Sequence, residues 1–550
     1  MLLALFPCAL AAQEVIGTRD ARTARVDSLF AAYDRQDSPG CAVGVYRDGA
    51  IAYARGYGMA DLERRVPITP HTVFDLGSTS KQITAASVIL LAQEGKLSLD
   101  DDVRRWVPEL PVYQRPITLR HLLNHTSGLR DYIGLLAMGG ARMDDVTTEE
   151  DALAAIARQR ELNFAPGDEH LYSNSGYFLL SVVAERAGGK PLRELARERI
   201  FAPLGMARTH VLRGYDDVVP DRALAYAPLP AGGYRADMPR WLQTGDGAVF
   251  STVEELLLWD RNFYESAVGG PGLLAELHAK GRLASGRELD YASGLMVSRT
   301  RGLPTVMHGG AWGGYRAELM RFPGERFSVA VLCNVATSDP TRLARGVAEI
   351  YLADRMEPAV SAPAPPAARA AVQVAPERLQ ALAGMYRDSA ARGTRTLAVE
   401  NGQLFVGTRP RYELRPVNDT EFVVLGAPAE VSVAFPAGAP GRLVWRQAGE
   451  EPQVFDKLVL VTPGADELAS YAGAYFSEEL QATFSLAVHD GALAVRRPAA
   501  EPAALRPLVR DEFSVPGATL RFVRDGSGAV AGFMLDAGRV RNLRFVRVPG

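Results

Sequence analysis

The stretch Phe74-Asp75-Leu76-Gly77-Ser78-Thr79-Ser80-Lys81 leads directly into an apolar run that ends at Gly95. Apolar residues recur through this run at helical spacing, and Gly95 is a natural stop just past the last turn. The pattern predicts a buried helix that Ser78 opens. Lys81 stands three residues further along on the same helix face, so its amine can reach the Ser78 hydroxyl.

This Ser-x-x-Lys pair has two interpretations, a catalytic pair and a chance spacing on a helix. A serine hydroxyl becomes a nucleophile when a neighbouring base takes its proton, and a desolvated lysine can do so. The helix N-terminus adds N–H groups that face a developing anion. The same spacing also occurs by chance on exposed helices. Composition favours the catalytic interpretation. Only five of the 61 Lys and Arg residues are Lys, so the chain uses Arg wherever any positive charge will serve, and Arg, unlike Lys, cannot be deprotonated to act as a base.

Length and composition limit the classes of protein that the chain can form. At 550 residues it exceeds one hydrophobic core, which suggests two to four domains. A hydrophobic content of 47% and a charged content of 23% are ordinary for globular proteins. The net charge of −3 gives no basic footprint for nucleic acid or a membrane surface. No apolar run after the N-terminus is long enough to span a membrane.

The N-terminal residues 1–12 form an apolar segment that ends in small residues, which is typical of the tail of a secretory signal. The segment lacks a basic start, as an incomplete signal would. We expect cleavage near Ala11 or Ala12 and export to the periplasm or the extracellular space. The alternatives are a lipid anchor on Cys8, which Pro7 disfavours, and a frayed cytoplasmic terminus.

Two cysteines remain beyond this segment, and each lies in an apolar strand-like run. A buried free thiol is the default for Cys41 and Cys333. They could form a disulfide only if their strands were neighbours. The sequence therefore predicts no disulfide framework and no cysteine-based metal site.

The order of elements predicts an α/β (α+β) domain over residues 13–356. A helix is expected at 20–36, a hairpin of strands 41–47 and 51–58, a mostly helical region at 100–240, strands at 296–299, 305–308, 318–322 and 328–334, and a helix at 341–353. The region 100–240 reads as an all-helical lobe that includes helices beginning near Thr118, at 149–158 and at 176–187. Strands from both ends would form one antiparallel sheet flanked by helices, with the site in a cleft between sheet and lobe.

A linker rich in Pro and Ala is expected at 357–373, and the chain beyond it repeats itself. Residues 382–386, Leu-Ala-Gly-Met-Tyr, match 471–475, Tyr-Ala-Gly-Ala-Tyr, at an offset of 89, and 397–402 match 486–491 at the same offset. Short strands and Asn-Gly or Asp-Gly turns predict two small antiparallel, lipocalin-like barrels, 374–462 and 463–550. With only two copies, each is expected to close its own core.

Three further stretches contain residues able to assist a Ser78 nucleophile. Tyr172 and Asn174 follow a Pro-Gly turn; a phenol can act as a base, and an amide can hold a substrate carbonyl. His308-Gly309-Gly310-Ala311 ends a strand, where glycines permit close approach and N–H groups can face an oxyanion. Residues 122–129 form a polar turn that we interpret as structural. Each pattern alone is common in unrelated proteins.

Taken together and in this order, these stretches resemble the motifs of the serine β-lactamase and penicillin-binding-protein-like family, the peptidase S12 type. The resemblance covers about residues 20–355, and the stretch Gly245 to Thr252 also fits it. It implies a β-lactamase/transpeptidase-like fold and an acyl-enzyme on Ser78. Lys81 and Tyr172 would share the base and acid roles.

The resemblance also implies how the substrate is held. Asn174 would bind the substrate amide, and the backbone N–H groups of Ser78 and Ala311 would form the oxyanion hole. The two barrels after a His-x-Gly strand resemble the arrangement in D-aminopeptidases of this family.

One departure from the family pattern bears on substrate choice. Penicillin-binding proteins and most β-lactamases carry Lys-Thr-Gly where this chain has His308-Gly309-Gly310. A mostly neutral His and a Gly would hold a substrate carboxylate poorly. This favours esters or N-terminal aminoacyl amides, with His308 and Gly310 contacting the substrate.

The sequence thus predicts an exported serine hydrolase that needs no metal or cofactor and acts on amides or esters. It would be a peptidase of D-aminopeptidase or D-Ala-D-Ala carboxypeptidase type, or an esterase, and its small-molecule or peptide substrates would include cell-wall-related compounds as one candidate class. The alternatives are a β-lactamase, a silent penicillin-binding-like sensor, and a metal hydrolase. The last would use His121, His125, Asp131 and His170, whose spacing lacks a metalloprotease motif.

Overall fold

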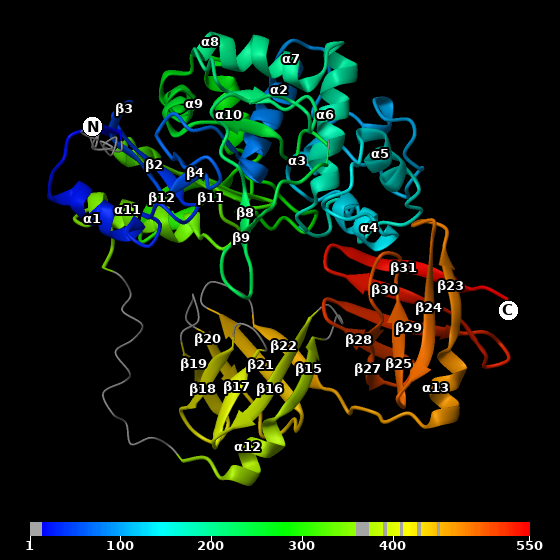
Figure 1. The fold of residues 1–550 in the computed structure, drawn as a ribbon. Coiled ribbons are helices and arrows are strands. Elements are labelled where there is room, and N and C mark those ends of the chain that lie inside the picture. Colours follow the sequence, from blue (N-terminus) through cyan, green and yellow to red (C-terminus); the bar gives the residue numbers. More distant parts are fainter. Residues whose placement is uncertain are drawn as a thin grey trace, which may run out of the picture.

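The structure, a computed structural model, describes residues 14–241, 243–358, 373–388, 393–407, 411–425, 431–447 and 452–549. The expected signal segment and most of the expected linker lie outside the described residues. Figure 1 shows an N-terminal domain of sheet and helices above two all-β modules, the first in yellow and the second in orange to red. Within the described part, no helix is both long and apolar enough to cross a bilayer.

A seven-stranded antiparallel sheet organises the described part of the N-terminal domain, as predicted. Its order is β1 (Val15–Gly17), β3 (Ala50–Tyr57), β2 (Cys41–Arg47), β14 (Phe327–Cys333), β13 (Tyr315–Phe322), β12 (Leu303–Trp312) and β11 (Met296–Thr300). The central pair, β2 and β14, joins the two ends of the domain, with Val45 opposite Val329. Asp48 and Gly49 both have positive φ in the β2–β3 turn, as an Asp-Gly hairpin requires.

Helices cover both faces of this sheet. On one face, α1 (Ala21–Phe30) and α11 (Pro340–Leu352) bury Val26, Phe30 and Val347 against the strands. The other face carries α9 (Val253–Glu265) and the central helix α2 (Lys81–Gln93), which belong to the largest core. Almost every residue of α2 is buried, as the apolar run predicts.

The region 100–240 is mostly but not entirely helical. Its helices are α3 (Leu119–Leu123), α4 (Tyr132–Gly139), α5 (Glu149–Ala157), α6 (Asn174–Gly188), α7 (Leu192–Ala196) and α8 (Ala202–Leu204), and α10 (Gly270–His278) packs on α2. Thr118 caps α3 as predicted. The expectation of an all-helical lobe is wrong, because β7 (His210–Val211) pairs with β10 (Val249–Ser251) beside β6 (Phe74–Asp75), and β8 (Tyr226–Pro228) pairs with β9 (Tyr234–Ala236). Strands of two or three residues are too short to show an alternating pattern in sequence.

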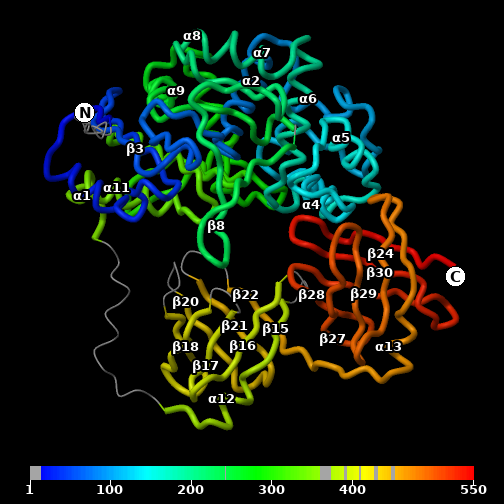
Figure 2. The backbone as a smooth tube through the Cα atoms, in the orientation of Figure 1, coloured from blue at the N-terminus to red at the C-terminus, as the bar shows by residue number. Residues whose placement is uncertain are grey.

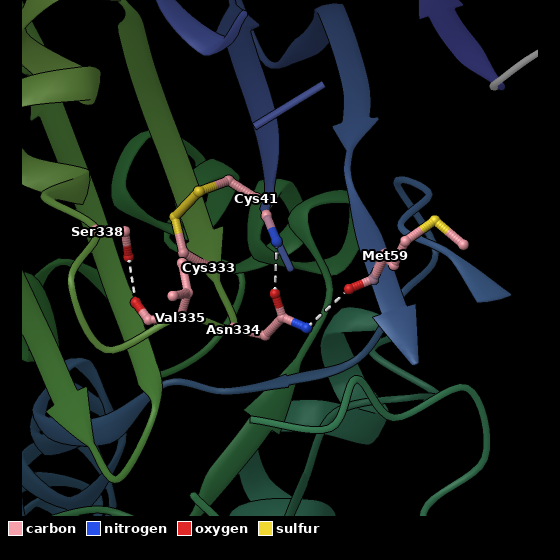
Figure 3. The surroundings of a disulfide bond; sticks show 7 residues. Cys41, Met59, Cys333, Asn334, Val335 and Ser338 are labelled. Atoms are coloured by element: carbon pink, nitrogen blue, oxygen red, sulfur yellow. Dashed lines mark hydrogen bonds between the residues drawn. A yellow bond between two sulfur atoms is a disulfide. The ribbon is translucent and has the colours of Figure 1, made fainter. Parts of the chain in front are cut away.

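The prediction of free thiols is also wrong. Cys41 at the start of β2 lies directly opposite Cys333 at the end of β14, with Cα atoms 4.0 Å apart, and the two form a disulfide (Figure 3). Next to it, Asn334 accepts a hydrogen bond from the N–H of Gly40 and donates one to the carbonyl of Met59. A separation of 292 residues hid the pairing, because it depends on which strands are sheet neighbours.

The first C-terminal module is a closed antiparallel barrel preceded by α12 (Pro376–Leu382). Its strands are β15 (Gly384–Asp388), β16 (Thr394–Glu400), β17 (Gln403–Val406), β18 (Tyr412–Pro416), β19 (Glu421–Val424), β20 (Val431–Ala434), β21 (Arg442–Gln447) and β22 (Gln453–Lys457). They enclose a core of their own that includes Phe422, Leu443 and Phe455.

The second module repeats the first and closes less completely. It consists of α13 (Ala465–Tyr471), β23 (Gly473–Ser477), β24 (Ala482–His489), β25 (Ala492–Arg496), β26 (Ala503–Ala504), β27 (Arg506–Val509), β28 (Glu512–Val515), β29 (Ala518–Arg524), β30 (Val530–Ala537) and β31 (Val540–Arg547). Its edge strands β26 and β27 are consecutive in the chain. The predicted repeat is confirmed in detail, since Tyr386 donates to the Leu382 carbonyl and Tyr475 to the Tyr471 carbonyl, both at 2.8 Å.

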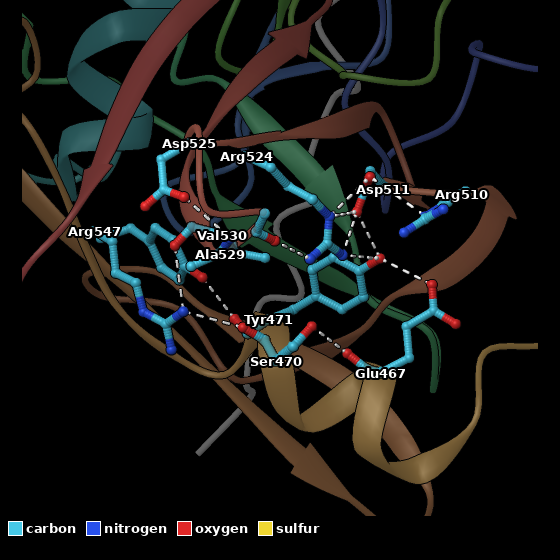
Figure 4. Close-up of polar contacts among 12 residues, drawn as sticks. Glu467, Ser470, Tyr471, Arg510, Asp511, Arg524, Asp525, Ala529, Val530 and Arg547 are labelled. Carbon is cyan, nitrogen blue, oxygen red and sulfur yellow. Dashed lines mark hydrogen bonds and ion pairs between the residues drawn. The ribbon is translucent and has the colours of Figure 1, made fainter.

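The second barrel does not close its core alone, which corrects the prediction. Leu135 and Met138 of α4 and Ala155 of α5 belong to the same buried cluster as the barrel interior. Figure 2 shows the β30–β31 end of this barrel against α4. At another part of the barrel, Asp511 accepts a hydrogen bond from the Tyr471 hydroxyl at 2.8 Å and pairs with Arg524 at 2.7 Å, which anchors α13 (Figure 4).

Candidate active site

The Ser78 and Lys81 side chains meet as the sequence predicts. Ser78 lies in a short 3₁₀ turn (Gly77–Ser80) that continues into α2, and Lys81 is the first residue of that helix. Lys81 Nζ lies 3.0 Å from Ser78 Oγ. Lys81 is fully buried, which desolvates its amine.

Two further contacts orient the Lys81 amine. Its Nζ donates to Asn174 Oδ1 at 3.0 Å and to the backbone carbonyl of Asp246 at 2.6 Å. Both partners are oxygens that can only accept. A neutral amine has two N–H groups and one lone pair, so these two bonds would use both N–H groups and turn the lone pair toward the Ser78 hydroxyl.

Asp131 fixes the orientation of the Asn174 amide. Asp131 Oδ2 accepts hydrogen bonds from the backbone N–H of Asn174 at 2.8 Å and from its Nδ2 at 3.1 Å. Since a carboxylate only accepts, the amide nitrogen must face Asp131 and the amide oxygen must face Lys81. The other oxygen of Asp131 caps α4 through the N–H groups of Ile133 and Gly134. Asp131, considered only as a metal ligand from the sequence, is thus a positioning residue.

The segment 245–249 is held on α2 opposite these groups. Thr84 Oγ1 donates to the Gly245 carbonyl at 2.7 Å, and Ser80 Oγ accepts from the N–H of Val249 at 3.1 Å. Burial raises the pKa of the Asp246 carboxyl to about 7, although the nearby Lys81 opposes the shift. No pattern in the sequence indicated that the Asp246 carbonyl would accept a hydrogen bond from Lys81, although the surrounding stretch Gly245 to Thr252 fits the family resemblance.

Tyr172 lies beside this group. Its ring centroid is 5.0 Å from Lys81 Nζ and 4.2 Å from the ring of His125. Its hydroxyl is buried and forms no hydrogen bond with any described residue. The phenol is therefore free to donate to, or accept from, a substrate at the Ser78 end of the site.

His308 is a neutral hydrogen-bonding residue in this site. Its Nδ1 contacts the Gly309 carbonyl at 2.6 Å, which can only accept, so Nδ1 carries the proton and Nε2 accepts from the Tyr291 hydroxyl at 3.0 Å. Burial and the positive charge of Lys81 lower the pKa of His308 to about 4. Tyr291 was missed from the sequence, where a lone tyrosine outside any motif gives no signal.

Two glycines bring the end of β12 against the Ser78 turn. A Cβ on Gly77 would lie 2.6 Å from the backbone nitrogen of Ala311, and a Cβ on Gly310 would lie 1.9 Å from the Leu76 carbonyl oxygen. Neither position has room for a side chain. This contact places the backbone of Ala311 next to the turn that carries Ser78, as an oxyanion hole built from both residues requires.

The predicted site residues surround one cavity of about 920 Å³. Its lining includes Ser78, Tyr172, Asn174, His308, Gly310 and Ala311, and Lys81 lies behind Ser78 and Asn174. The sequence did not predict that Arg539 of the second barrel would also line it.

The residues considered for a metal hydrolase form hydrogen bonds and ring contacts within the protein instead. His121 Nδ1 accepts from the backbone N–H of Thr118 in the cap of α3, and His125 Nδ1 accepts from the N–H of Ser173. The His125 and His170 rings are 6.1 Å apart at their centroids. Among the described residues, no group of three or more His, Cys, Asp or Glu side chains is arranged to hold a metal ion.

Comparisons with known proteins agree with this geometry. The family described as Beta-lactamase matches residues 26–352. A D-aminopeptidase from Gluconobacter oxydans is 27% identical over 548 residues, which cover 96% of this chain and 100% of that protein.

Among solved structures, the octameric penicillin-binding protein homologue from Pyrococcus abyssi superimposes with a TM-score of 0.55 at 22% identity, over 79% of this chain and 99% of that one. The D-amino acid amidase from Ochrobactrum anthropi SV3 in complex with D-phenylalanine has a TM-score of 0.52 at 22% identity, over 61% of this chain and 100% of that one. At this identity both likenesses show the fold alone.

Proposed function

The chain belongs to the β-lactamase family of serine hydrolases, and from that premise we propose that it hydrolyses amides of D-amino acids, as an aminopeptidase or amidase, through an acyl-enzyme on Ser78. The observation that carries the proposal is the contact of Lys81 Nζ with Ser78 Oγ at 3.0 Å, in a geometry where its other two contacts are acceptors. The intact contact of Lys81 with Ser78 argues against a silent binding protein.

In the acylation step, the Ser78 oxygen forms a bond to the substrate carbonyl carbon while its proton passes to Lys81. The carbonyl oxygen becomes an oxyanion, which the N–H groups of Ser78 and Ala311 stabilise. The Asn174 amide is fixed by Asp131, so it can hold the substrate amide and Lys81 at the same time.

The bond to the leaving amine then breaks, and the amine takes a proton. Tyr172, whose ring lies beside Lys81 and whose hydroxyl has no partner in the described structure, would relay that proton. A water molecule attacks the ester on Ser78 in the second half of the reaction, with the same groups acting in reverse.

The substrate class rests on two kinds of support. The D-aminopeptidase from Gluconobacter oxydans aligns along the whole of its length and with 96% of this chain. In addition, His308 stands neutral where the family pattern has a lysine, which disfavours β-lactams and peptides held by that lysine. Peptides that contain D-residues, as in bacterial cell walls, are a natural source of such substrates.

The test is steady-state hydrolysis of matched D- and L-alaninamide and of the p-nitroanilides of both, with wild type and Ser78→Ala. We expect turnover of the D-forms that depends on Ser78. Equal rates for D and L, or turnover of benzylpenicillin above that of the D-amides, would contradict the proposal.

Export belongs to the same proposal. The Cys41–Cys333 disulfide supports it, because disulfides persist in oxidising compartments and are rare in a reducing cytoplasm. Fractionation of a bacterial host that expresses the chain with and without residues 2–12 tests this. Export that does not depend on those residues, or retention in the cytoplasm of both forms, would contradict it.

A further inference from the structure

The tip of the β30–β31 hairpin is locked onto the N-terminal domain. Arg130 is fully buried and pairs with Glu479 at 2.8 Å. It also donates from Nε to the Arg541 carbonyl at 2.9 Å and from Nη2 to the Asn542 carbonyl at 2.8 Å. Because one guanidinium holds the barrel at three points, the hairpin tip is a fixed wall of the site.

This docking directs one side chain of the barrel into the cavity. The Arg539 carbonyl accepts from Asn163 Nδ2 at 2.9 Å and from the backbone N–H of Asp131. The Arg539 guanidinium then lies 4.7 Å from the centre of the Tyr172 ring and lines the cavity with Ser78 and Asn174.

Most of the Arg539 guanidinium remains available to a ligand. Among the described residues, its side chain has one polar contact, from Nη1 to Asp131 Oδ2 at 3.5 Å. That carboxylate already accepts four backbone or amide N–H bonds at shorter or equal range. The side chain is 45% exposed, so several of its five N–H donors face the open cavity.

The rest of the cavity lining is also positively charged. Arg222, Arg240 and Arg316 line it, and within the described residues none of them lies in an ion pair with a carboxylate. Three carboxyls also line the cavity: burial raises the pKa of Asp75 and Asp246 to about 7, and Asp339 caps α11 through the N–H of Arg342. With Arg539, four arginines line the cavity against three carboxyls, so positive charge predominates, and an excess of one sign concentrates ligands of the opposite sign.

We infer that Arg539 is a substrate-binding residue for a carboxylate, so that among its amide and ester substrates this enzyme selects those carrying a negative charge. The guanidinium fork matches a carboxylate with two parallel hydrogen bonds. Arg539 of the second barrel would thus bind the substrate carboxylate that His308 and Gly309 on β12 cannot bind. The inference rests on the proposed Ser78 chemistry and deepens it by naming the substrate class.

Two sources of the carboxylate are distinguished by pairs of substrates that differ little in size. D-glutamate p-nitroanilide against D-glutamine p-nitroanilide tests a carboxylate on the acyl side chain. D-Ala-D-Ala against D-Ala-D-Ala-amide tests a carboxylate on the leaving group. We expect wild type to prefer the anionic member of at least one pair by about 10- to 100-fold in kcat/KM, the range of one charge-assisted interaction.

Arg539→Met should remove that preference by lowering kcat/KM for the anionic member of the pair far more than for the neutral member, and Arg539→Lys should retain part of it. The matched control is Arg541→Gln on the same hairpin, whose side chain pairs with Glu169 at 3.1 Å outside the cavity lining. It should keep the wild-type preference.

Equal loss on both members of each pair in Arg539→Met, or no preference in wild type, would overturn the inference. A further pair, 4-nitrophenyl hemisuccinate and 4-nitrophenyl butyrate, separates this result from failure of the D-amide proposal. An Arg539-dependent preference for the hemisuccinate without any D-amide turnover would refute the D-amide substrate and support the anion site. No Ser78-dependent turnover of any compound would refute both.

Discussion

Replacing Asp131 with Asn should disable the site without removing any catalytic group. The substitution keeps the side-chain volume, and Asn is as good a helix N-cap as Asp, so α4 should keep its cap. It removes the charge that fixes the Asn174 amide through contacts of 2.8 and 3.1 Å. The NH₂ group that the substitution introduces can turn toward Asn174, and the Asn174 amide can then present its own NH₂ to Lys81 instead of its oxygen.

The expected magnitude follows from the bonds involved. A hydrogen bond to a charged group contributes about 1.5–3 kcal/mol, so losing one in the transition state lowers kcat/KM by about 10- to 150-fold. The loss should fall mainly on kcat, because Asp131 is not in the cavity lining and orients Lys81 through Asn174.

The assay is kcat and KM for a D-aminoacyl p-nitroanilide, together with urea unfolding of each variant. Ser175→Ala is the matched control, because the Ser175 hydroxyl is equally buried, donates to the Arg130 carbonyl at 2.6 Å, accepts from the N–H of Tyr132 at 2.8 Å and has no hydrogen bond to Lys81 in the described structure. It should lose about 1–3 kcal/mol of stability and keep its activity. Asp131→Asn activity within twofold of wild type, or equal loss in the control, would refute the reasoning.

Three further predictions concern stability. His308 has a pKa of about 4 in the folded state and about 6.5 in the unfolded state, so the unfolded chain binds more protons between these pH values and stability rises with pH. The difference in free energy of unfolding between wild type and His308→Gln should therefore grow in favour of wild type by up to about 3 kcal/mol from pH 4 to 6.5 and then stay level. A difference that does not change with pH would contradict this. Changing both Cys41 and Cys333 to Ser should lower the free energy of unfolding by about 2–5 kcal/mol, and dithiothreitol should destabilise wild type but not the variant. Removing 463–550 should leave the apolar side of α4 uncovered and give an aggregating protein; a soluble, active fragment would contradict the shared core.

The local parts of the site could be predicted from the sequence, because their geometry is set within one helix or strand. Ser78 lies in the 3₁₀ turn that continues into α2 and Lys81 is the first residue of α2, so the two are one turn apart whatever surrounds them, and Thr118 caps its helix through residues adjacent in the chain. The 89-residue repeat was visible because both barrels place the same turn and aromatic residues at the same strand positions.

The parts that escaped prediction depend on contacts between distant segments. Asp131 acts on Asn174 43 residues away, and Arg539 reaches Asp131 across 408 residues. No pattern around either residue signals these partners. The cysteines also looked unpaired, since only the order of strands in the sheet shows that β2 and β14 are neighbours.

The measurement that tests the central claim most directly is rapid-quench intact mass of the protein during turnover of a D-aminoacyl ester, followed by peptide mapping. Ser78 acylation predicts a transient adduct of the acyl mass on the peptide that contains Ser78, and no adduct in Ser78→Ala. Turnover with no adduct in the wild type, or an adduct that persists in Ser78→Ala, would contradict the account.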